Sequence, residues 1–347
     1  MDKTSIEKAF NAATKPARIK EAVLFVENTK GDFSECRGYG GRDIHSPMTM
    51  ASITKLLTTA CILKLCEQKR LSLEDKINRY FDKELLSGIH VLNGQDYSQC
   101  LTIADLLFQT SGLPDSFESG NYYASALMKA VIHEDTALTF EQVIAETKAL
   151  KPRFAPNTGN KAFYANINFD LLGEILEKAT GLPLSELYKQ MVFKPLGLDK
   201  TYLPVSEADF VPHIFYKSQR LERPNLIASC RASGGCVTTT KDLMVFSRGF
   251  WAGALFDKRV FERLTRYKKL QSNKGPIWYG GGYMRIPLEG PTTMFMGKGE
   301  LLGHSGSTGS FAFYYPWKDL HIVGDLVQFA NPALPIRLTM RLAMFIK

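Results

Sequence analysis

Runs of residues typical of β-strands lie at both ends of this 347-residue sequence, and they constrain the fold more than any other feature. Near the amino end, residues 22–26 form an apolar run followed by a turn at residues 29–32. Near the carboxyl end, similar runs cover residues 292–296, 311–315 and 322–329, and Pro316 opens a hairpin turn between the last two. A sheet assembled from both ends of the chain is therefore expected.

Helix signals fill the segment between these runs. A long apolar stretch begins at Ser52 and contains no Gly or Pro until after Arg70, which predicts a buried central helix. Another helix is expected over residues 169–179, because its apolar residues recur at helical spacing and Gly181 follows them. Patterns resembling a capping box, each expected to begin a helix, occupy residues 72–75, 102–105, 139–142 and 239–242. Amphipathic stretches at the amino terminus and over residues 334–346 predict two further helices.

This order of elements predicts an α+β fold in which an antiparallel sheet is flanked by helices and a helical lobe is inserted. Residues 1–68 and 255–347 are expected to form the mixed lobe, and residues 69–254 the mainly helical lobe. The active site is expected in the cleft between the two lobes. With 45% hydrophobic residues, the chain can bury a substantial core.

Charge and composition exclude several classes of function. The net charge of +8 comes from Lys and Arg scattered among acidic residues, which favours a solvated surface over a nucleic-acid site. The six Cys and six His form no zinc-ligand pattern, so we expect no metal, no cofactor and reduced thiols. No apolar run is long enough for a signal peptide or a membrane span, and we expect a soluble, cytoplasmic protein. The oligomeric state stays open.

Ser52 and Lys55 are candidates for a nucleophile and its base. Their spacing of three residues places both side chains on one helical face within reach of each other. A serine hydroxyl becomes a useful nucleophile when a neighbouring group takes its proton, and the helix amino terminus favours negative charge nearby. The SxxK pattern is weak by itself, because Ser5 and Lys8 match it equally well.

Two further motifs strengthen this interpretation. Tyr164 and Asn166 form the chain's only YxN sequence, directly before the helix over residues 169–179. His304 and Gly306 form its only HxG sequence, before a strand near the carboxyl end. Small residues at such a position let another chain approach the backbone closely. The alternative for Tyr164 is a buried structural tyrosine, for Asn166 a helix cap, and for His304 a packed side chain without contact to ligand.

With SxxK, YxN and HxG in this order, the sequence resembles the serine beta-lactamase and penicillin-binding-protein superfamily. The resemblance is strongest to its class C branch, which includes DD-peptidases, D-aminopeptidases and related esterases. Segments 102–107, 110–114, 195–198 and 232–235 also fit that family. The resemblance implies that Ser52 attacks an acyl carbonyl while Lys55 and Tyr164 move the protons. It also implies that Asn166 binds Lys55 or a substrate amide.

The family pattern implies an oxyanion hole made by the backbone N–H groups of Ser52 and Ser307. His304 departs from that pattern, because penicillin-recognising relatives commonly carry Lys-[Thr/Ser]-Gly at the matching place. A histidine that is uncharged near neutral pH binds a substrate carboxylate less well than lysine does. An aromatic segment with Phe117, Tyr122 and Tyr123 is expected near the mouth of the cleft, where it could contact an apolar substrate group or pack against other helices.

The expected function is therefore that of a serine hydrolase with an acyl-enzyme intermediate. Its substrates are expected to be small esters or D-amino-acid-containing amides or peptides, with weak or no beta-lactamase activity. One alternative is a beta-lactamase or DD-carboxypeptidase proper. Another is a protein with the same fold that binds peptidoglycan fragments, or a partner, without catalysis, although such a protein would not need all of Ser52, Lys55, Tyr164 and Asn166.

Overall fold

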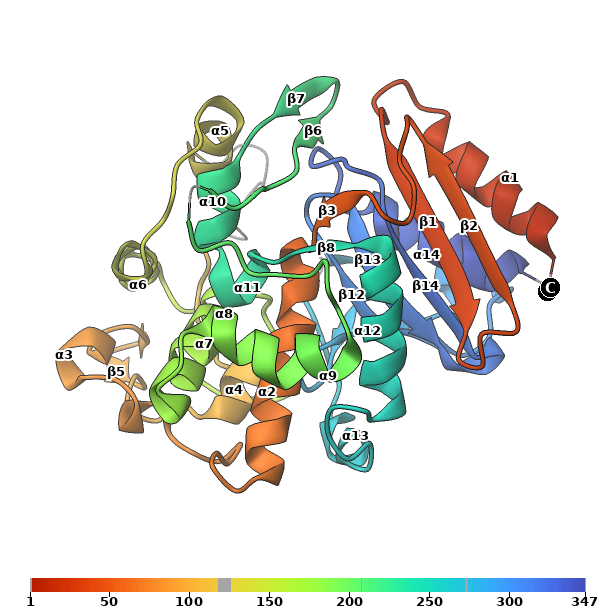
Figure 1. The fold of residues 1–347 in the computed structure, drawn as a ribbon. Coiled ribbons are helices and arrows are strands. Elements are labelled where there is room, and N and C mark those ends of the chain that lie inside the picture. The colour runs from red at the N-terminus through yellow and green to blue at the C-terminus, as the bar shows by residue number, and fades with distance from the viewer. Residues whose placement is uncertain (1, 118–125, 207, 272–273, 347) are drawn as a thin grey trace.

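A computed structural model describes residues 2–117, 126–206, 208–271 and 274–346. Its central feature is an antiparallel sheet built from both ends of the chain (Figure 1). Within the described residues the sheet has eight strands in the order β2-β1-β14-β13-β12-β11-β10-β9. Their bounds are β1 Ala22–Asn28, β2 Ser34–Tyr39, β9 Lys268–Lys269, β10 Trp278–Tyr279, β11 Met284–Pro287, β12 Glu300–Ser305, β13 Ser310–Tyr315 and β14 Leu320–Asp325.

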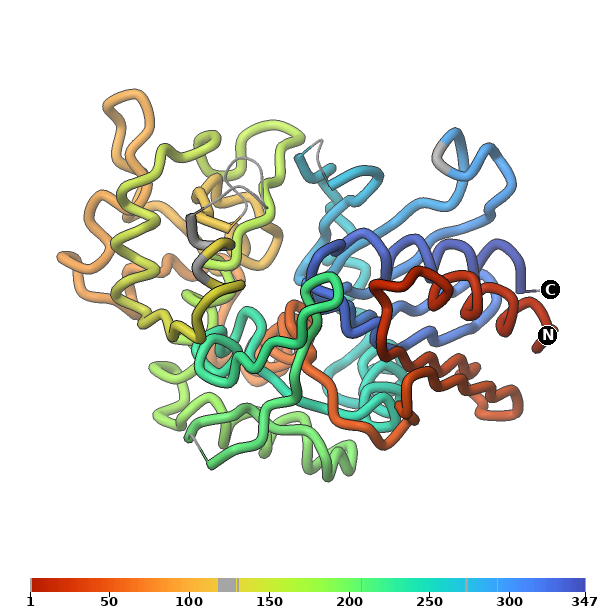
Figure 2. The backbone as a smooth tube through the Cα atoms, turned by 90° about the horizontal axis from the view of Figure 1, so that it is seen from above, coloured from red at the N-terminus to blue at the C-terminus, as the bar shows by residue number. Residues whose placement is uncertain are grey.

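Strand β1 joins the two ends of the chain, because it pairs with β2 on one side and with β14 on the other. In its register with β14, Phe25 lies opposite Val323. The helices α1 (Lys3–Thr14) and α14 (Leu334–Phe345) lie together on one face of the sheet, and α12 (Thr240–Ala252) covers the other face (Figures 1 and 2). These observations confirm the predicted fold class.

The remaining elements form the part of the molecule beside the sheet. The helices are α2 Thr54–Glu67, α3 Lys83–Leu86, α4 Ile103–Leu107, α5 Ala126–His133, α6 Phe140–Ala149, α7 Ile167–Thr180, α8 Leu184–Tyr188, α9 Lys194–Leu196, α10 Pro224–Ser229, α11 Arg231–Gly234 and α13 Val260–Leu264. Short strand pairs are formed by β3 Pro47–Thr49 with β8 Val237–Thr239, β4 Val91–Leu92 with β5 Gln95–Asp96, and β6 Ile214–Tyr216 with β7 Gln219–Leu221. The predicted division into two lobes stays a prediction.

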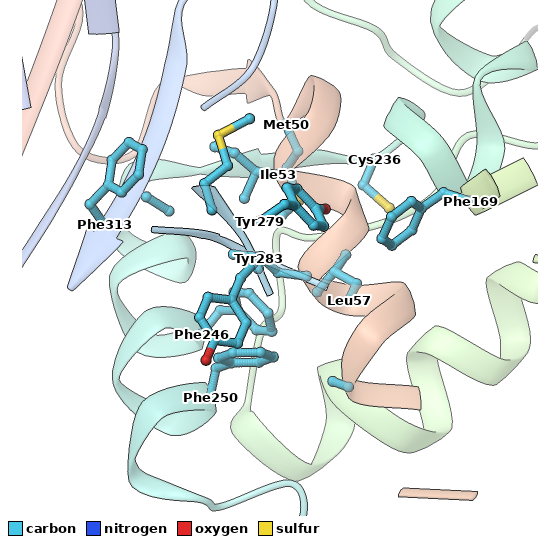
Figure 3. Close-up of a cluster of buried hydrophobic side chains, with 14 of the residues drawn as sticks. Met50, Ile53, Leu57, Phe169, Cys236, Phe246, Phe250, Tyr279, Tyr283 and Phe313 are labelled. Carbon is cyan, nitrogen blue, oxygen red and sulfur yellow. The ribbon is translucent and has the colours of Figure 1, made fainter. Parts of the chain in front are cut away.

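Helix α2 is the buried centre of the molecule. Nearly all of its side chains are buried, and it packs against α7, α8 and α11. Figure 3 shows Leu57 of α2 and Ile53 just before it among aromatic side chains, including Tyr283 from the sheet side and Phe169 from α7. Because the helix is surrounded on all sides, its apolar sequence lacks a polar face. This burial holds the start of α2 in a defined position.

Several predicted helix ends are observed as expected. The Thr102 and Thr139 side chains cap α4 and α6, each with the reciprocal bond of a capping box. Thr239 caps α12 by accepting a hydrogen bond from the Asp242 backbone. Gly181 ends α7 in the left-handed conformation, with φ of 73°.

The helix predicted to start at residues 72–75 is wrong. Asp75 accepts the hydrogen bond from the Ser72 backbone as a capping box would, but the chain then turns. The backbone of this segment pairs instead with a distant one, since Ile103 and Ala104 donate to the carbonyls of Asp75 and Leu73. These tertiary hydrogen bonds compete with a helix for the same carbonyl groups.

The strand predicted over residues 292–296 is also wrong. Its residues form a 3-10 turn, Pro291–Thr293, followed by Met294 and Phe295 with φ of 52° and 62°. The Thr293 hydroxyl stabilises the turn by donating to the carbonyl of Leu288. An extended strand needs negative φ at every residue, so this backbone cannot pair as one.

Candidate active site

Ser52 lies in a 3-10 turn, Ala51–Ile53, at the beginning of α2. Neighbouring elements hold this turn from two sides. The Met50 N–H donates to the carbonyl of Cys236 (2.8 Å), and the Ser310 hydroxyl donates to the carbonyl of Met50 (2.8 Å). Ala51 has φ of 44°, a conformation that costs a non-glycine residue free energy and persists only where surrounding contacts enforce it. Ser52 is therefore presented at a constrained point between α2 and the sheet.

Lys55 is fully buried, and its Nζ atom lies within hydrogen-bonding distance of several acceptors. It donates to Ser52 Oγ (3.1 Å), to Asn166 Oδ1 (2.8 Å) and to the carbonyl of Ser233 (2.6 Å). Three acceptors use all three N–H bonds of an ammonium group, whereas a neutral amine has two. The contacts thus fit a charged Lys55, and they offset the cost of burying that charge.

Asn166 occupies the N-cap position of α7, but its side chain makes no capping hydrogen bond. Its amide oxygen is directed to Lys55, while its backbone N–H donates to Asp115 Oδ2 (2.5 Å). The expected contact between Asn166 and Lys55 is therefore observed, and the alternative of a capping hydrogen bond from its side chain is not.

Tyr164 is nearly buried and lies close to both Lys55 and His304. The Lys55 Nζ atom is 5.1 Å from the centroid of the tyrosine ring, and the ring centroids of Tyr164 and His304 are 5.8 Å apart. Its backbone N–H donates to Gln271 Oε1 (3.0 Å). The fold therefore brings Ser52, Lys55 and Tyr164 together from segments more than a hundred residues apart.

His304 is buried in strand β12 and is absent from the described lining of the pocket beside Ser52. Its Nδ1 atom lies 2.8 Å from the carbonyl oxygen of Ser305, and its Nε2 atom lies 3.5 Å from the Tyr279 hydroxyl. Burial, with the Lys55 ammonium second, lowers the pKa of His304 to about 3. The histidine is therefore neutral near pH 7, and this position does not support direct contact with a substrate.

Gly306 and Ser307 follow His304 at the turn between β12 and β13. Ser307 lines the pocket with Ser52. A Cβ atom on Gly306 would come within 2.1 Å of Ser310 Oγ and 2.8 Å of the Met50 carbonyl oxygen. Glycine at this position therefore allows the β12–β13 turn to lie directly against the segment that carries Ser52.

The pocket extends from Ser52 into an apolar space between α5, α6, α10 and β6. Phe117, from the aromatic segment predicted to lie at the cleft, is part of its wall, whereas Tyr122 and Tyr123 lie outside the described residues. The apolar lining includes Phe117, Val131, Leu138, Phe140, Val143, Ile167, Leu184, Ile214, Leu226, Ile227 and Phe329. Such a surface binds an apolar group through the hydrophobic effect.

Ionisable side chains on the pocket wall are mostly acidic. Asp115, Glu146, Asp170 and Glu174 line it, and Arg231 is the one cationic side chain in the described part of the lining. Arg231 is paired with Glu174 and Glu177, at 2.6 Å in both cases. The wall therefore offers a substrate carboxylate little electrostatic stabilisation.

Sequence reasoning missed several of these residues. Asp115 and Lys274 each lie far along the chain from the residues they approach, and no local pattern marks them. Asp170 is in the first turn of α7, where an acidic residue is also expected for helix stability. Burial raises the pKa of the Asp170 carboxyl, although a hydrogen bond from Ser233 and the Lys55 ammonium oppose that change. The segment 232–235 was noted through the family resemblance alone.

Comparison with known proteins places the chain in a family. A model of the family described as Beta-lactamase matches residues 31–328. The methylbutanoyltransferase mlcH of Penicillium citrinum is 27% identical over 247 residues, which cover 64% of this chain and 56% of that protein. The D-alanyl-D-alanine-carboxypeptidase/endopeptidase AmpH of Escherichia coli is 26% identical over 230 residues, which cover 66% and 54%. The chain thus spans about half the length of these curated relatives.

Solved structures agree at the level of the fold. A D-stereospecific amidohydrolase from Streptomyces sp. superposes with a TM-score of 0.78 at 23% identity, covering 99% of both chains. Together with the family match over most of the sequence, this shows that the chain belongs to the beta-lactamase family. The resemblance stated from the SxxK, YxN and HxG motifs is confirmed. Within the described residues, no helix is long and apolar enough to cross a membrane.

Proposed function

We propose that this protein is a serine hydrolase that forms an acyl-enzyme on Ser52. The observation that carries the proposal is the contact between Lys55 Nζ and Ser52 Oγ at 3.1 Å, with Lys55 also held by Asn166 and the Ser233 carbonyl. Because Lys55 donates to the serine oxygen, the serine proton is left for another base. Tyr164 is the candidate, since its phenolate form is favoured by the neighbouring ammonium group.

In the proposed acylation step, the Ser52 hydroxyl gives its proton to the Tyr164 phenolate while Ser52 Oγ forms a bond to the acyl carbon. The carbonyl oxygen becomes an oxyanion, which the backbone N–H groups of Ser52 and Ser307 stabilise. Each such donor typically contributes about 3 kcal/mol to the transition state. Tyr164 then returns the proton to the leaving alcohol or amine as the bond to the acyl carbon breaks. In deacylation, water attacks the acyl carbon and gives a proton to Tyr164, which returns the proton to Ser52 Oγ as the bond between Ser52 Oγ and the acyl carbon breaks and the acid is released.

The proposed substrates are small esters or amides of D-amino acids that carry an apolar group. The apolar pocket beside Ser52 supports this choice, and so does the scarcity of positive charge on its wall. A beta-lactam or a terminal D-alanine presents a carboxylate, for which the neutral His304 and the paired Arg231 are poor partners. Weak or no beta-lactamase activity follows from the same argument.

The first test is intact-protein mass spectrometry after exposure to a fluorophosphonate. A single adduct is expected on the wild type and none on Ser52→Ala, because the probe bonds to an activated serine oxygen and releases fluoride. Ser5→Ala is the matched control, since Ser5 lies in the other SxxK sequence on α1 and should leave labelling unchanged. Folded wild type without an adduct would contradict the hydrolase and favour a protein that binds without catalysis.

The second test compares substrates. Nitrophenyl esters and D-amino-acid amides are expected to be turned over faster than nitrocefin. Efficient cleavage of nitrocefin, with esters and amides left intact, would overturn the proposed substrate class and make the protein a beta-lactamase proper.

A further inference from the structure

A second lysine lies beside Tyr164. The Lys274 Nζ atom is 5.1 Å from the centroid of the tyrosine ring, the same distance as the Nζ atom of Lys55. Lys274 belongs to the loop between β9 and β10, which carries none of the family motifs described above. Lys55 and Lys274, which belong to different segments of the chain, thus both lie beside Tyr164, the proposed base.

Hydrogen bonds fix the position of this loop relative to Tyr164. Gln271, in the same loop, accepts the hydrogen bond from the Tyr164 backbone (3.0 Å). The backbone N–H of Lys274 donates to the carbonyl of Gln271 (2.9 Å). These main-chain hydrogen bonds therefore hold the backbone of Lys274 near Tyr164. The approach of the two residues does not depend on the flexible lysine side chain alone.

His304 cannot provide the positive charge that a lysine at its position would provide. Its ring is buried and its pKa is lowered to about 3, first by burial and then by the Lys55 ammonium. The Lys274 ammonium also contributes to lowering the pKa of His304, so its positive charge acts at the position of His304. Positive charge thus reaches the surroundings of Tyr164 from another segment of the chain.

Tyr279 and the nearby acidic groups do not supply positive charge to the ring of Tyr164. Tyr279 packs edge-on against its ring, and burial raises the pKa of the Tyr279 phenol, so it stays neutral. The acidic groups nearby on the pocket wall are Asp115 and Asp170, and burial favours the neutral form of Asp170. Lys55 and Lys274 are the cations placed over the ring among the described residues.

We propose that Lys274 is a positioning residue whose positive charge favours the phenolate form of Tyr164 and so activates Ser52. This inference rests on the proposed function and deepens it. A cation close to a tyrosine ring favours the negatively charged phenolate over the neutral phenol, and one pKa unit corresponds to a tenfold change in the phenolate fraction. A tyrosine with an ordinary pKa near 10 is mostly protonated near neutral pH, so a second cation increases the phenolate fraction that can act as a base.

The test measures the rate of Ser52 labelling by a fluorophosphonate as a function of pH. The probe carries no carboxylate, so a role of Lys274 in binding a substrate anion cannot affect the result. Lys274→Met removes the charge and keeps the length of the side chain, whereas Lys274→Arg keeps the charge. Lys269→Met removes a charge from the exposed strand β9 of the same region and serves as the control.

We expect the acidic limb of the Lys274→Met profile to move up by about one pH unit, with about tenfold slower labelling at pH 7. Lys274→Arg should restore most of the rate, and Lys269→Met should match the wild type. If the wild type is labelled and the pH profile of Lys274→Met coincides with the wild-type profile, the inference is overturned and the proposed function stands. Absence of labelling in the wild type itself would instead defeat the proposed function.

Discussion

Two buried ionisable side chains, Lys55 and His321, are matched to specific partners. Lys55 has an acceptor for each N–H, and His321 lies between the hydroxyls of Ser247 and Thr29, at 2.9 Å from Nδ1 and 3.2 Å from Nε2. Burial of His321 lowers its pKa to about 4, which keeps the ring neutral in the folded protein. Its protonation therefore couples folding to pH at a place remote from the candidate site.

The folded-state pKa of His321 lies below that of an unfolded histidine, about 6.5. As the pH falls, the unfolded chain therefore binds a proton first. The stability contributed by neutral His321 is complete above pH 6.5 and is lost as the pH falls toward 4. Between pH 7 and 5 this loss amounts to about 2 kcal/mol in the free energy of unfolding.

Urea unfolding of His321→Gln at pH 7 and pH 5 tests this linkage. The loss of stability between the two pH values should be about 2 kcal/mol smaller in the variant than in the wild type. His45→Gln, at an exposed site, is the control and should behave as the wild type does. Equal losses in His321→Gln and the wild type would show that His321 is not the coupled group.

At the scale of elements, the candidate site depends on how closely the β12–β13 turn approaches the start of α2. The contact is set by main chain on both sides, since Gly306 lies against the Met50 carbonyl and the Ala51 methyl group. A side chain at position 306 must push these two segments apart. The positions of Ser52 and of the proposed oxyanion donors would then change together.

Gly306→Ala is therefore expected to slow labelling of Ser52 by a fluorophosphonate at least tenfold. Overpacking of this kind also costs about 1–3 kcal/mol of stability. Gly88→Ala is the matched control, because Gly88 has φ of +77° with no neighbour within 4 Å of an added Cβ. It should cost about 1–2 kcal/mol through backbone strain alone and leave labelling unchanged. Wild-type labelling of Gly306→Ala would contradict the proposed geometry.

At the scale of the whole molecule, the pocket combines segments that are distant in sequence. Phe117, Val143, Leu226 and Phe329 meet in its apolar wall, although they span more than two hundred residues of the chain. A substrate group of several carbons bound there would be removed from water, at about 0.8 kcal/mol for each buried CH₂. Reaction rates should therefore increase with the length of an apolar acyl chain.

Filling this pocket should change the chain-length preference. Val143 on α6 lines it and is only half-buried, so Val143→Trp can place a ring in the space without repacking the core. We expect kcat/KM for nitrophenyl hexanoate to fall at least tenfold, while that for the acetate changes less than twofold. Val245→Trp, on the exposed face of α12, should alter neither value. A parallel loss on both esters would show that the pocket does not bind the acyl chain.

Local patterns were sufficient to predict much of the fold. Caps at Thr102, Thr139 and Thr239, and the terminating Gly181, depend on residues within one turn of one another, so they can be read from the sequence. The i, i+3 spacing of Ser52 and Lys55 is local in the same sense, and the two side chains lie within 3.1 Å. The two failures, at residues 72–75 and 292–296, arose where distant backbone partners or left-handed residues decided the conformation.

The sequence by itself determined the fold class, the order of the motifs and the family, because these depend on local periodicity and on short patterns. Only the tertiary structure decided that Asn166 faces Lys55, that His304 is buried and neutral, and that Lys274 approaches Tyr164. The physical reason is that burial and electrostatic contact depend on three-dimensional distance. Residues 164 and 274 become neighbours only when the chain folds, and no short pattern in the sequence marks that contact.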